Sequence, residues 1–139
     1  MAVHTRRFKI NAKADTDIID ITGQVQEELS LTGLKAGIAL VFVPGSTAAI
    51  STIEYESGVV DDLAEAVERI APRNIPYAHD ARWRDGNGHS HVRSALVGSS
   101  FSVPFADGKL ILGTWQQIVL LDFDVRPRSR EIVVQIMGE

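Results

Sequence analysis

The stretch from residue 37 to residue 43 reads Gly-Ile-Ala-Leu-Val-Phe-Val, an uninterrupted apolar run that ends at Pro44. Seven residues are few for a helix in a globular domain. An apolar run without polar alternation is typical of a strand that has protein packed against both of its faces. We therefore expect a strand here that is buried on both faces.

Segments on either side of this run predict further strands, with turn signals between them. The segment 6–13 alternates apolar and polar side chains, which is the pattern of a half-buried strand. Asp107-Gly108 is a hairpin signal because both residues tolerate the left-handed backbone of a tight turn. The other expected strands are 17–20, 48–54, 91–97, 100–103, 109–112, 114–123 and 130–137.

Two segments have apolar residues at helical spacing. The first begins at Thr22, whose hydroxyl can cap a helix, and the second covers 59–70 and is stopped by Pro72. The polar segment 73–88 is expected to be a long loop, and loops of that length in a compact domain are usually functional or disordered. The pattern predicts one α+β domain over residues 1–139, with β-sandwich or jelly-roll-like sheets and two packed helices.

Composition limits the class of protein. Of the 139 residues, 45% are hydrophobic and 23% are charged, the mix of an ordinary globular domain. The net charge of −4 disfavours a dedicated nucleic-acid role, because such surfaces need positive charge to displace phosphate counterions. The chain lacks cysteine, so disulfides and thiolate chemistry are excluded. We see no signal peptide and no apolar run of about 20 residues, so we expect a cytoplasmic protein without a membrane partner.

The sharpest chemical signal is the pair His89 and His91, which are two positions apart. In an extended chain such residues point to the same side, so both imidazoles would face one point. Neutral imidazole nitrogens bind zinc and similar divalent ions, and a third ligand would complete an open site. His79, Asp80 and Glu54 are the candidates for that ligand. The alternative is that the histidines are loop residues hydrogen-bonded to the backbone.

Other polar residues lie in loops or at strand ends. Asn87, between two glycines, either orients a substrate or simply adopts a left-handed turn. Ser46 and Thr47 follow Gly45 in a loop whose backbone N–H groups can bind an anion, although a plain turn is the alternative. Glu54 ends a strand and is a candidate general base or metal ligand.

Arginine and amide side chains extend the candidate site. Arg93 follows the histidine pair, and its guanidinium matches the geometry of phosphate oxygens. We assign Arg128 and Arg130 instead to a surface or a subunit interface. Gln116 precedes a strongly apolar run, and a buried amide needs a hydrogen-bond partner, so we expect Gln116 at a wet edge, an interface or a site. Trp115 either packs in the core or lines the same site as Gln116.

Together these residues resemble the YjbQ-like family. The resemblance covers nearly the whole chain in order. Its most specific parts are Leu112 to Gln116, which reads Leu-Gly-Thr-Trp-Gln, and the spacing from Asn87 to His91. The other matching pieces are 42–44, 46–48, Glu54, 77–79, 91–93, 96–98, 103–104, 108–111, 122–123, 127–128 and 138–139.

The resemblance implies a sandwich-like β domain with two helices, assembled as a homotrimer with a site near the subunit boundaries. It implies that His79, Asn87 and His91 belong to that site. It also implies thiamine-phosphate synthase activity as a secondary activity, which joins hydroxymethylpyrimidine diphosphate to thiazole phosphate and releases pyrophosphate. Such chemistry needs cations that stabilise the leaving diphosphate, either a metal ion or basic side chains.

One position departs from the family pattern. Many members carry histidine directly after the proline, where this chain has Gly45. We hypothesise that His89 replaces the missing imidazole, so that three imidazoles remain in one site. A distance of more than about 7 Å from His89 to both His79 and His91 would exclude this, because no single ion could then bridge them.

The expected site has three groups of residues. The catalytic group is His91, His79, Asn87 and Glu54; the substrate-binding group is Ser46, Thr47, Arg93, Trp115 and Gln116; and the metal group is His79, His89 and His91. A zinc or magnesium ion is the one cofactor that we consider, and we expect no organic cofactor. The expected partners are a small phosphorylated molecule and other copies of the chain.

Two rival functions remain open. A metal-dependent hydrolase of a small phosphorylated or amide substrate would use a three-histidine zinc site to activate water. A non-enzymatic module would bind a small anionic ligand, with the histidines as hydrogen-bond donors only. The sequence leaves open whether the protein is an enzyme.

Overall fold

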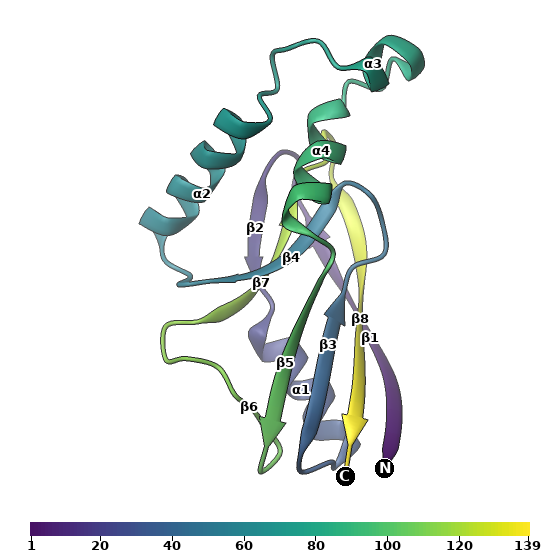
Figure 1. Cartoon of the computed structure of the whole chain (residues 1–139), viewed down its shortest axis with the longest axis vertical. Coiled ribbons are helices and arrows are strands. Elements are labelled where there is room, and N and C mark those ends of the chain that lie inside the picture. Colours follow the sequence, from purple (N-terminus) through teal and green to yellow (C-terminus); the bar gives the residue numbers. More distant parts are fainter.

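The computed structural model describes residues 1–139 and contains eight strands and four helices (Figure 1). In chain order the elements are β1 (Ala2–Ala12), β2 (Asp17–Asp20), α1 (Thr22–Thr32), β3 (Gly37–Phe42), β4 (Ala48–Ile53), α2 (Ser57–Ile70), α3 (Ala78–Trp83), α4 (Gly88–Val97), β5 (Ser100–Ala106), β6 (Lys109–Leu110), β7 (Gln117–Asp122) and β8 (Arg128–Gly138). None of the helices combines the length and the apolar composition that crossing a lipid bilayer would require.

The strands form two antiparallel sheets. The larger sheet, here called sheet A, has the order β1-β8-β3-β5-β6, and the smaller sheet B has the order β2-β7-β4. β1 and β8 are both eleven residues long and pair along their whole length, from Ala2 opposite Gly138 to Ala12 opposite Arg128. This pairing brings the two ends of the chain together at one end of sheet A (Figure 1).

The main core lies between the two sheets and α1. It combines Val25 and Leu29 of α1 with inward-facing residues of both sheets, such as Val41, Leu120 and Val134, all of them fully buried. A second apolar cluster lies on the other face of sheet B, where Val67 of α2 packs against the sheet. Sheet B is therefore covered on both faces, whereas α1 covers only one face of sheet A (Figure 1).

The predicted α+β domain with β-sandwich or jelly-roll-like sheets is confirmed as two curled antiparallel sheets, but four helices replace the predicted two. α3 lies inside the predicted loop 73–88, and α4 occupies the segment 91–97 that we predicted as a strand. The reason is visible in α4, whose buried residues include His89, Ser90, Arg93 and Ser94. These residues recur at helical spacing, but they are polar, so a search for apolar periodicity misses them.

The central strand β3 also differs from its prediction. Ala39 and Val41 face the core and are fully buried, but Ile38 is 55% exposed and Phe42 is 38% exposed. The apolar run is thus a strand, but only one of its faces is covered within the chain. The predicted strand 114–123 begins only at Gln117, because residues 111–116 form a loop.

Candidate functional site

The histidine site lies where α3 meets α4. α3 carries His79, and Asn87 precedes α4, which carries His91 near its start. The short connection works because Gly88 has no side chain: a Cβ there would come within 2.5 Å of the Tyr77 Cβ. The backbone N–H of Gly88 also donates to the Asp80 carboxylate at 2.9 Å, which ties the start of α4 to α3.

Three of the predicted catalytic residues come together here. The rings of His79 and His91 have centroids 4.4 Å apart, and His79 Nε2 lies 3.1 Å from Asn87 Oδ1. An amide oxygen can only accept, so this hydrogen bond requires a proton on His79 Nε2. His79 Nε2 also lies 3.5 Å from an Asp85 carboxylate oxygen. The cluster therefore offers imidazoles that can accept or donate a proton.

His91 borders a hollow of about 310 Å³ that is also lined by Gly45, Ser46 and Ser99. The backbone N–H groups of Gly45 and Ser46 have no hydrogen-bond partner within the chain. Such unpaired donors in a small-residue loop suit an anion. Gly45 adopts a φ of 133°, and a Cβ at this position would come 3.2 Å from Arg130 Nη1, so a side chain here would press on a buried arginine.

Asn87 borders a second hollow of about 240 Å³, which is also lined by Asp85, Asp124, Arg126 and Arg128. Arg126 is exposed and makes no ion pair, whereas Arg128 donates to Asp124 at 2.7 Å. Sequence reasoning assigns Arg128 to an interface or surface and does not identify Arg126. The sequence signal for both is the alternation of arginines at 126, 128 and 130, which places guanidinium groups along one short stretch.

A buried ionic network around Arg130 lies next to both hollows. Arg130 donates to both carboxylate oxygens of Asp122, at 2.6 and 3.1 Å, and to the Thr47 hydroxyl at 2.7 Å. Burial on its own would raise the pKa of Asp124, but hydrogen bonds from Arg128 and from the Val125 N–H, with the Arg128 charge, hold that pKa below its usual value. Thr47 is buried and its hydroxyl is engaged in this network, so it is not free to bind a substrate.

The structure corrects the prediction for His89. Because α4 is a helix, His89 and His91 are separated by about 200° around its axis and do not face one point. His89 is 1% exposed, and its unpaired Nε2 lies 3.8 Å from an Asp15 carboxylate oxygen that also has no hydrogen-bond partner. Burial, with the charges of Arg93 and Arg73, lowers the pKa of this imidazole. It therefore does not replace the imidazole missing at Gly45.

Arg93 is likewise a buried structural residue. It is 2% exposed, and its guanidinium donates to the Ala71 carbonyl at 3.0 Å, to the Thr16 hydroxyl at 2.9 Å and to Glu68. These contacts tie α4 to α2 and to the turn between β1 and β2. With its donors used in this way, Arg93 does not reach the surface where we expected a substrate phosphate.

The remaining predicted residues lie at the opposite end of β4. Ser94 of α4 hydrogen-bonds to the Ala48 carbonyl at the start of β4, while Gln116 Nε2 donates to Thr52 near its end, at 3.2 Å. A six-residue strand is about 20 Å long. Glu54 and Trp115 belong to this far end, where Trp115 is 72% exposed. Within one chain, these residues therefore do not line the histidine site.

The donors present do not build a metal centre. No group of three His, Asp or Glu side chains in the chain is arranged to hold an ion. The expected ion held by His79, His89 and His91 is therefore not supported by this arrangement.

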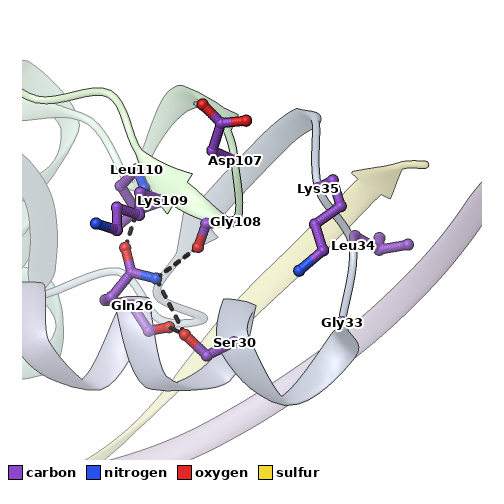
Figure 2. A pocket seen from close by; sticks show the side chains of 9 residues that line it. All are labelled: Gln26, Ser30, Gly33, Leu34, Lys35, Asp107, Gly108, Lys109 and Leu110. Atoms are coloured by element: carbon purple, nitrogen blue, oxygen red, sulfur yellow. Dashed lines mark hydrogen bonds between the residues drawn. The ribbon is translucent and has the colours of Figure 1, made fainter.

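The largest cavity, about 550 Å³, lies between α1 and the β5–β6 hairpin and contains no histidine (Figure 2). Gln26 of α1 crosses to the hairpin, donating to the Gly108 carbonyl at 3.0 Å and accepting from the Leu110 N–H at 3.0 Å. These bonds occupy backbone groups at the free edge of β6, a two-residue strand. The cavity is therefore a consequence of the way in which α1 packs against the hairpin. No sequence pattern predicted it.

Comparison with known proteins places this arrangement in a family. Residues 6–139 match the family described as UPF0047 protein YjbQ-like. A UPF0047 protein of Methanothermobacter thermautotrophicus is 37% identical over all of this chain and 95% of its own length. The UPF0047 protein YugU of Bacillus subtilis is 34% identical over 96% of this chain and 98% of its own length.

Solved structures agree with the sequence relatives. The crystal structure of a YbjQ-like protein of unknown function from Sulfolobus solfataricus has a TM-score of 0.89 and 32% identity, and the match covers 99% of this chain and 100% of that one. A crystal structure from Aeropyrum pernix has a TM-score of 0.91 and 32% identity, covering 98% of this chain and 99% of that one. On sequence and structure alike, the chain belongs to the UPF0047, YjbQ-like family.

Proposed function

We propose that the histidine site joins two small phosphorylated substrates, hydroxymethylpyrimidine diphosphate and thiazole phosphate, to form thiamine phosphate. The observation that supports this proposal is a pair of polar hollows next to the histidine cluster, one bordered by His91 and the other by Asn87. One hollow presents unpaired backbone N–H groups at Gly45 and Ser46, and the other presents Arg126 and Arg128. A reaction between two phosphorylated molecules needs two such subsites at one reactive centre.

The two hollows differ in their donor groups, which suggests how the substrates divide between them. Arg126 makes no ion pair, although Asp85 and Asp124 also line its hollow, so its guanidinium is available to the more highly charged diphosphate. The Gly45–Ser46 loop supplies neutral donors, which suit the phosphate monoester. In this assignment the reactive carbon and the thiazole nitrogen meet beside His79 and His91.

The chemistry requires charge stabilisation more than proton transfer. The carbon–oxygen bond to the diphosphate breaks, a carbon–nitrogen bond to the thiazole forms, and the diphosphate leaves with the bonding electrons. Since the attacking thiazole nitrogen carries no proton, no base is needed for the attack. Arg126 and the imidazoles can stabilise the negative charge that develops on the leaving oxygen. Asn87 orients His79 through the hydrogen bond at 3.1 Å.

Glu54, Trp115 and Gln116, at the far end of β4, can contribute to the site only if copies of the chain assemble. The family resemblance implies a homotrimer with sites near subunit boundaries. In such an assembly, Glu54, Trp115 and Gln116 of a neighbouring subunit would complete the substrate surface that one chain leaves open.

The test is thiamine-phosphate formation from the two substrates, with and without added magnesium, by wild-type protein and by His91→Ala. The matched control is His4→Ala, because His4 lies on β1 away from the site. We expect product from the wild type and the control and a loss of at least about tenfold in His91→Ala, because this variant lacks an imidazole that stabilises the charge on the leaving diphosphate. Equal product from all three proteins, or none from any, would refute the proposal. Binding of both phosphates without turnover would instead identify a ligand-binding module.

A further inference from the structure

One pair of residues in the histidine site can react with itself. Asn87 is followed by Gly88, whereas the other two asparagines of the chain, Asn11 and Asn74, are followed by alanine and isoleucine. A glycine has no Cβ, so the preceding side chain can approach its backbone nitrogen closely. Asn87 is therefore the asparagine of this chain whose side-chain amide is most easily lost.

The reaction needs only water as a co-reactant. The backbone nitrogen of Gly88 loses its proton and attacks the carboxamide carbon of Asn87. A carbon–nitrogen bond forms and closes a succinimide ring, while the bond to the side-chain nitrogen breaks and that nitrogen leaves as ammonia, taking up the proton. Water then opens the ring and leaves either aspartate or isoaspartate. Asn87 lines an open hollow, so water reaches it.

The fold holds the two reacting atoms apart. Ring closure requires Asn87 Cβ and Gly88 N on the same side of the Cα–C bond, but the ψ of 22° at Asn87 places them on nearly opposite sides. The Gly88 N–H donates to Asp80 at 2.9 Å, and this carboxylate disfavours the nitrogen anion that attacks. His79 polarises the Asn87 carboxamide through the bond at 3.1 Å, so the restraint comes from Asp80 and not from His79.

α3 carries this restraint and is weakly anchored. It has six residues, none of them buried, and it lies beyond the ends of the strands (Figure 1). Both of its side-chain hydrogen bonds end on the reactive pair, from His79 to Asn87 and from Gly88 to Asp80. A short segment without buried side chains opens locally more easily than the whole domain unfolds. Opening of α3 therefore frees both reacting groups at once.

The product changes the charge of the second hollow. A carboxylate at position 87 lies in the hollow that Arg126 lines, and Arg126 makes no other ion pair. The new charge pairs with this guanidinium and repels an incoming anion. Isoaspartate also lengthens the backbone at the start of α4, which displaces His91.

We propose that Asn87-Gly88 is a site of spontaneous deamidation that α3 keeps closed through Asp80, and that the modification ends anion binding in the hollow beside Arg126. The effect on the hollow rests on the proposed function. The modification itself depends only on the reactive pair and on Asp80.

Peptide mass spectrometry of the full chain, incubated without substrates at neutral and at mildly alkaline pH, tests the site. It measures conversion at Asn87, with Asn11 and Asn74 as references in the same molecule. The test variant is Asp80→Ala. The matched control is Asp61→Ala, because Asp61 is an exposed acid on α2. Circular dichroism identifies any variant that does not fold.

We expect faster conversion at Asn87 than at Asn11 and Asn74, rising with pH because the attacking nitrogen must lose its proton. Asp80→Ala should convert about tenfold faster than the wild type, the factor for one hydrogen bond to a charged group, and Asp61→Ala should match the wild type. Conversion at Asn87 that is no faster than at the reference asparagines in any of these proteins overturns the site. Equal rates in the wild type and in folded Asp80→Ala overturn the restraint.

Two measurements do not depend on how Asp80→Ala folds. In wild-type protein the amide hydrogen of Gly88 should exchange with solvent before that of Val134 in β8, and equal exchange would refute local opening of α3. Pyrophosphate should bind Asn87→Asp at least about tenfold more weakly than the wild type by calorimetry, and equal affinities overturn the effect on the hollow. A wild type that binds no pyrophosphate counts against the proposed function and not against deamidation.

Discussion

Removing the buried guanidinium of Arg130 should destabilise the protein strongly. Arg130 satisfies both carboxylate oxygens of Asp122, which is fully buried, and it donates to Thr47. Arg130→Ala leaves the Asp122 charge without its bidentate partner in a site that water does not reach. Breaking a buried ion pair from one side costs about 3–5 kcal/mol, which is a large part of the 5–15 kcal/mol typical of a whole domain.

The measurement is the free energy of unfolding from urea titrations followed by circular dichroism. Arg7→Ala is the matched control, because Arg7 pairs with Glu131 at 3.3 Å with both side chains about half exposed. An exposed ion pair contributes about 0–1 kcal/mol, so the two substitutions should differ by at least about 2 kcal/mol.

A second variant separates the cost of the unpaired charge from the loss of packing. Arg130→Ala combined with Asp122→Asn should recover part of the stability, since the double variant buries no uncompensated carboxylate. Two results would contradict this reasoning. One is a free energy of unfolding that falls no further in Arg130→Ala than in Arg7→Ala. The other is a double variant that is less stable than Arg130→Ala alone.

Two further predictions concern the support of α4. Burial and the charges of Arg93 and Arg73 lower the pKa of His89 in the folded chain. Below about pH 6.5, His89 of the unfolded chain therefore binds a proton that His89 of the folded chain does not bind. The stability from the neutral imidazole is therefore complete above that pH and is lost as the pH falls, with a slope of at most about 1.4 kcal/mol per pH unit. Urea titrations from pH 7.5 downward should show that the free energy of unfolding falls less steeply with pH in His89→Gln than in the wild type. Equal slopes would contradict the assignment. Gly88→Ala should lower the free energy of unfolding by about 1–3 kcal/mol, because its Cβ would come within 2.5 Å of the Tyr77 Cβ. Gly23→Ala in α1, where nothing lies within 4 Å, should instead raise it by about 0.5–1 kcal/mol, and a loss of similar size in both variants would show that the contact with Tyr77 is not the cause.

Apolar periodicity predicted the elements whose buried faces are apolar. It identified α2, whose apolar residues recur at helical spacing, and most of the paired strands. It could not identify α4, because that helix buries histidine, serine and arginine and exposes Leu96, which is 63% exposed. Which side of a helix is inside is decided by tertiary contacts such as those of Arg93, and these have no signature in local sequence.

The same error explains the misjudged candidate site. The expectation that His89 and His91 share one direction depended on an extended backbone, and it failed once that segment became a helix. The meeting of His79, Asn87 and His91 followed from the family resemblance, not from local pattern. The arginines at 126 and 128 reach the site through the turn between β7 and β8, a tertiary placement that spacing along the chain does not encode.

The distribution of buried polar residues gives an independent reason to locate function at this end of the molecule. Eight polar or charged side chains are buried, and all of them belong to the network of Arg130 or to α4: Thr47, His89, Ser90, Arg93, Ser94, Asp122, Asp124 and Arg130. The Asp15 N–H donates to the Asp124 carbonyl, which connects the network of Arg130 to the contacts of Arg93 and His89.

Stability alone does not account for this concentration. A buried ion pair is often no more stabilising than apolar residues of the same volume, and the rest of the core, around Val25, Leu29 and Leu120, uses apolar residues only. What a fully hydrogen-bonded network does provide is a fixed position for the groups attached to it. Here those groups are the Gly45–Ser46 loop, the arginines at 126 and 128, and the start of α4 with His91. The polar core is therefore best explained as the support that holds this loop, these arginines and the start of α4 in fixed positions relative to one another.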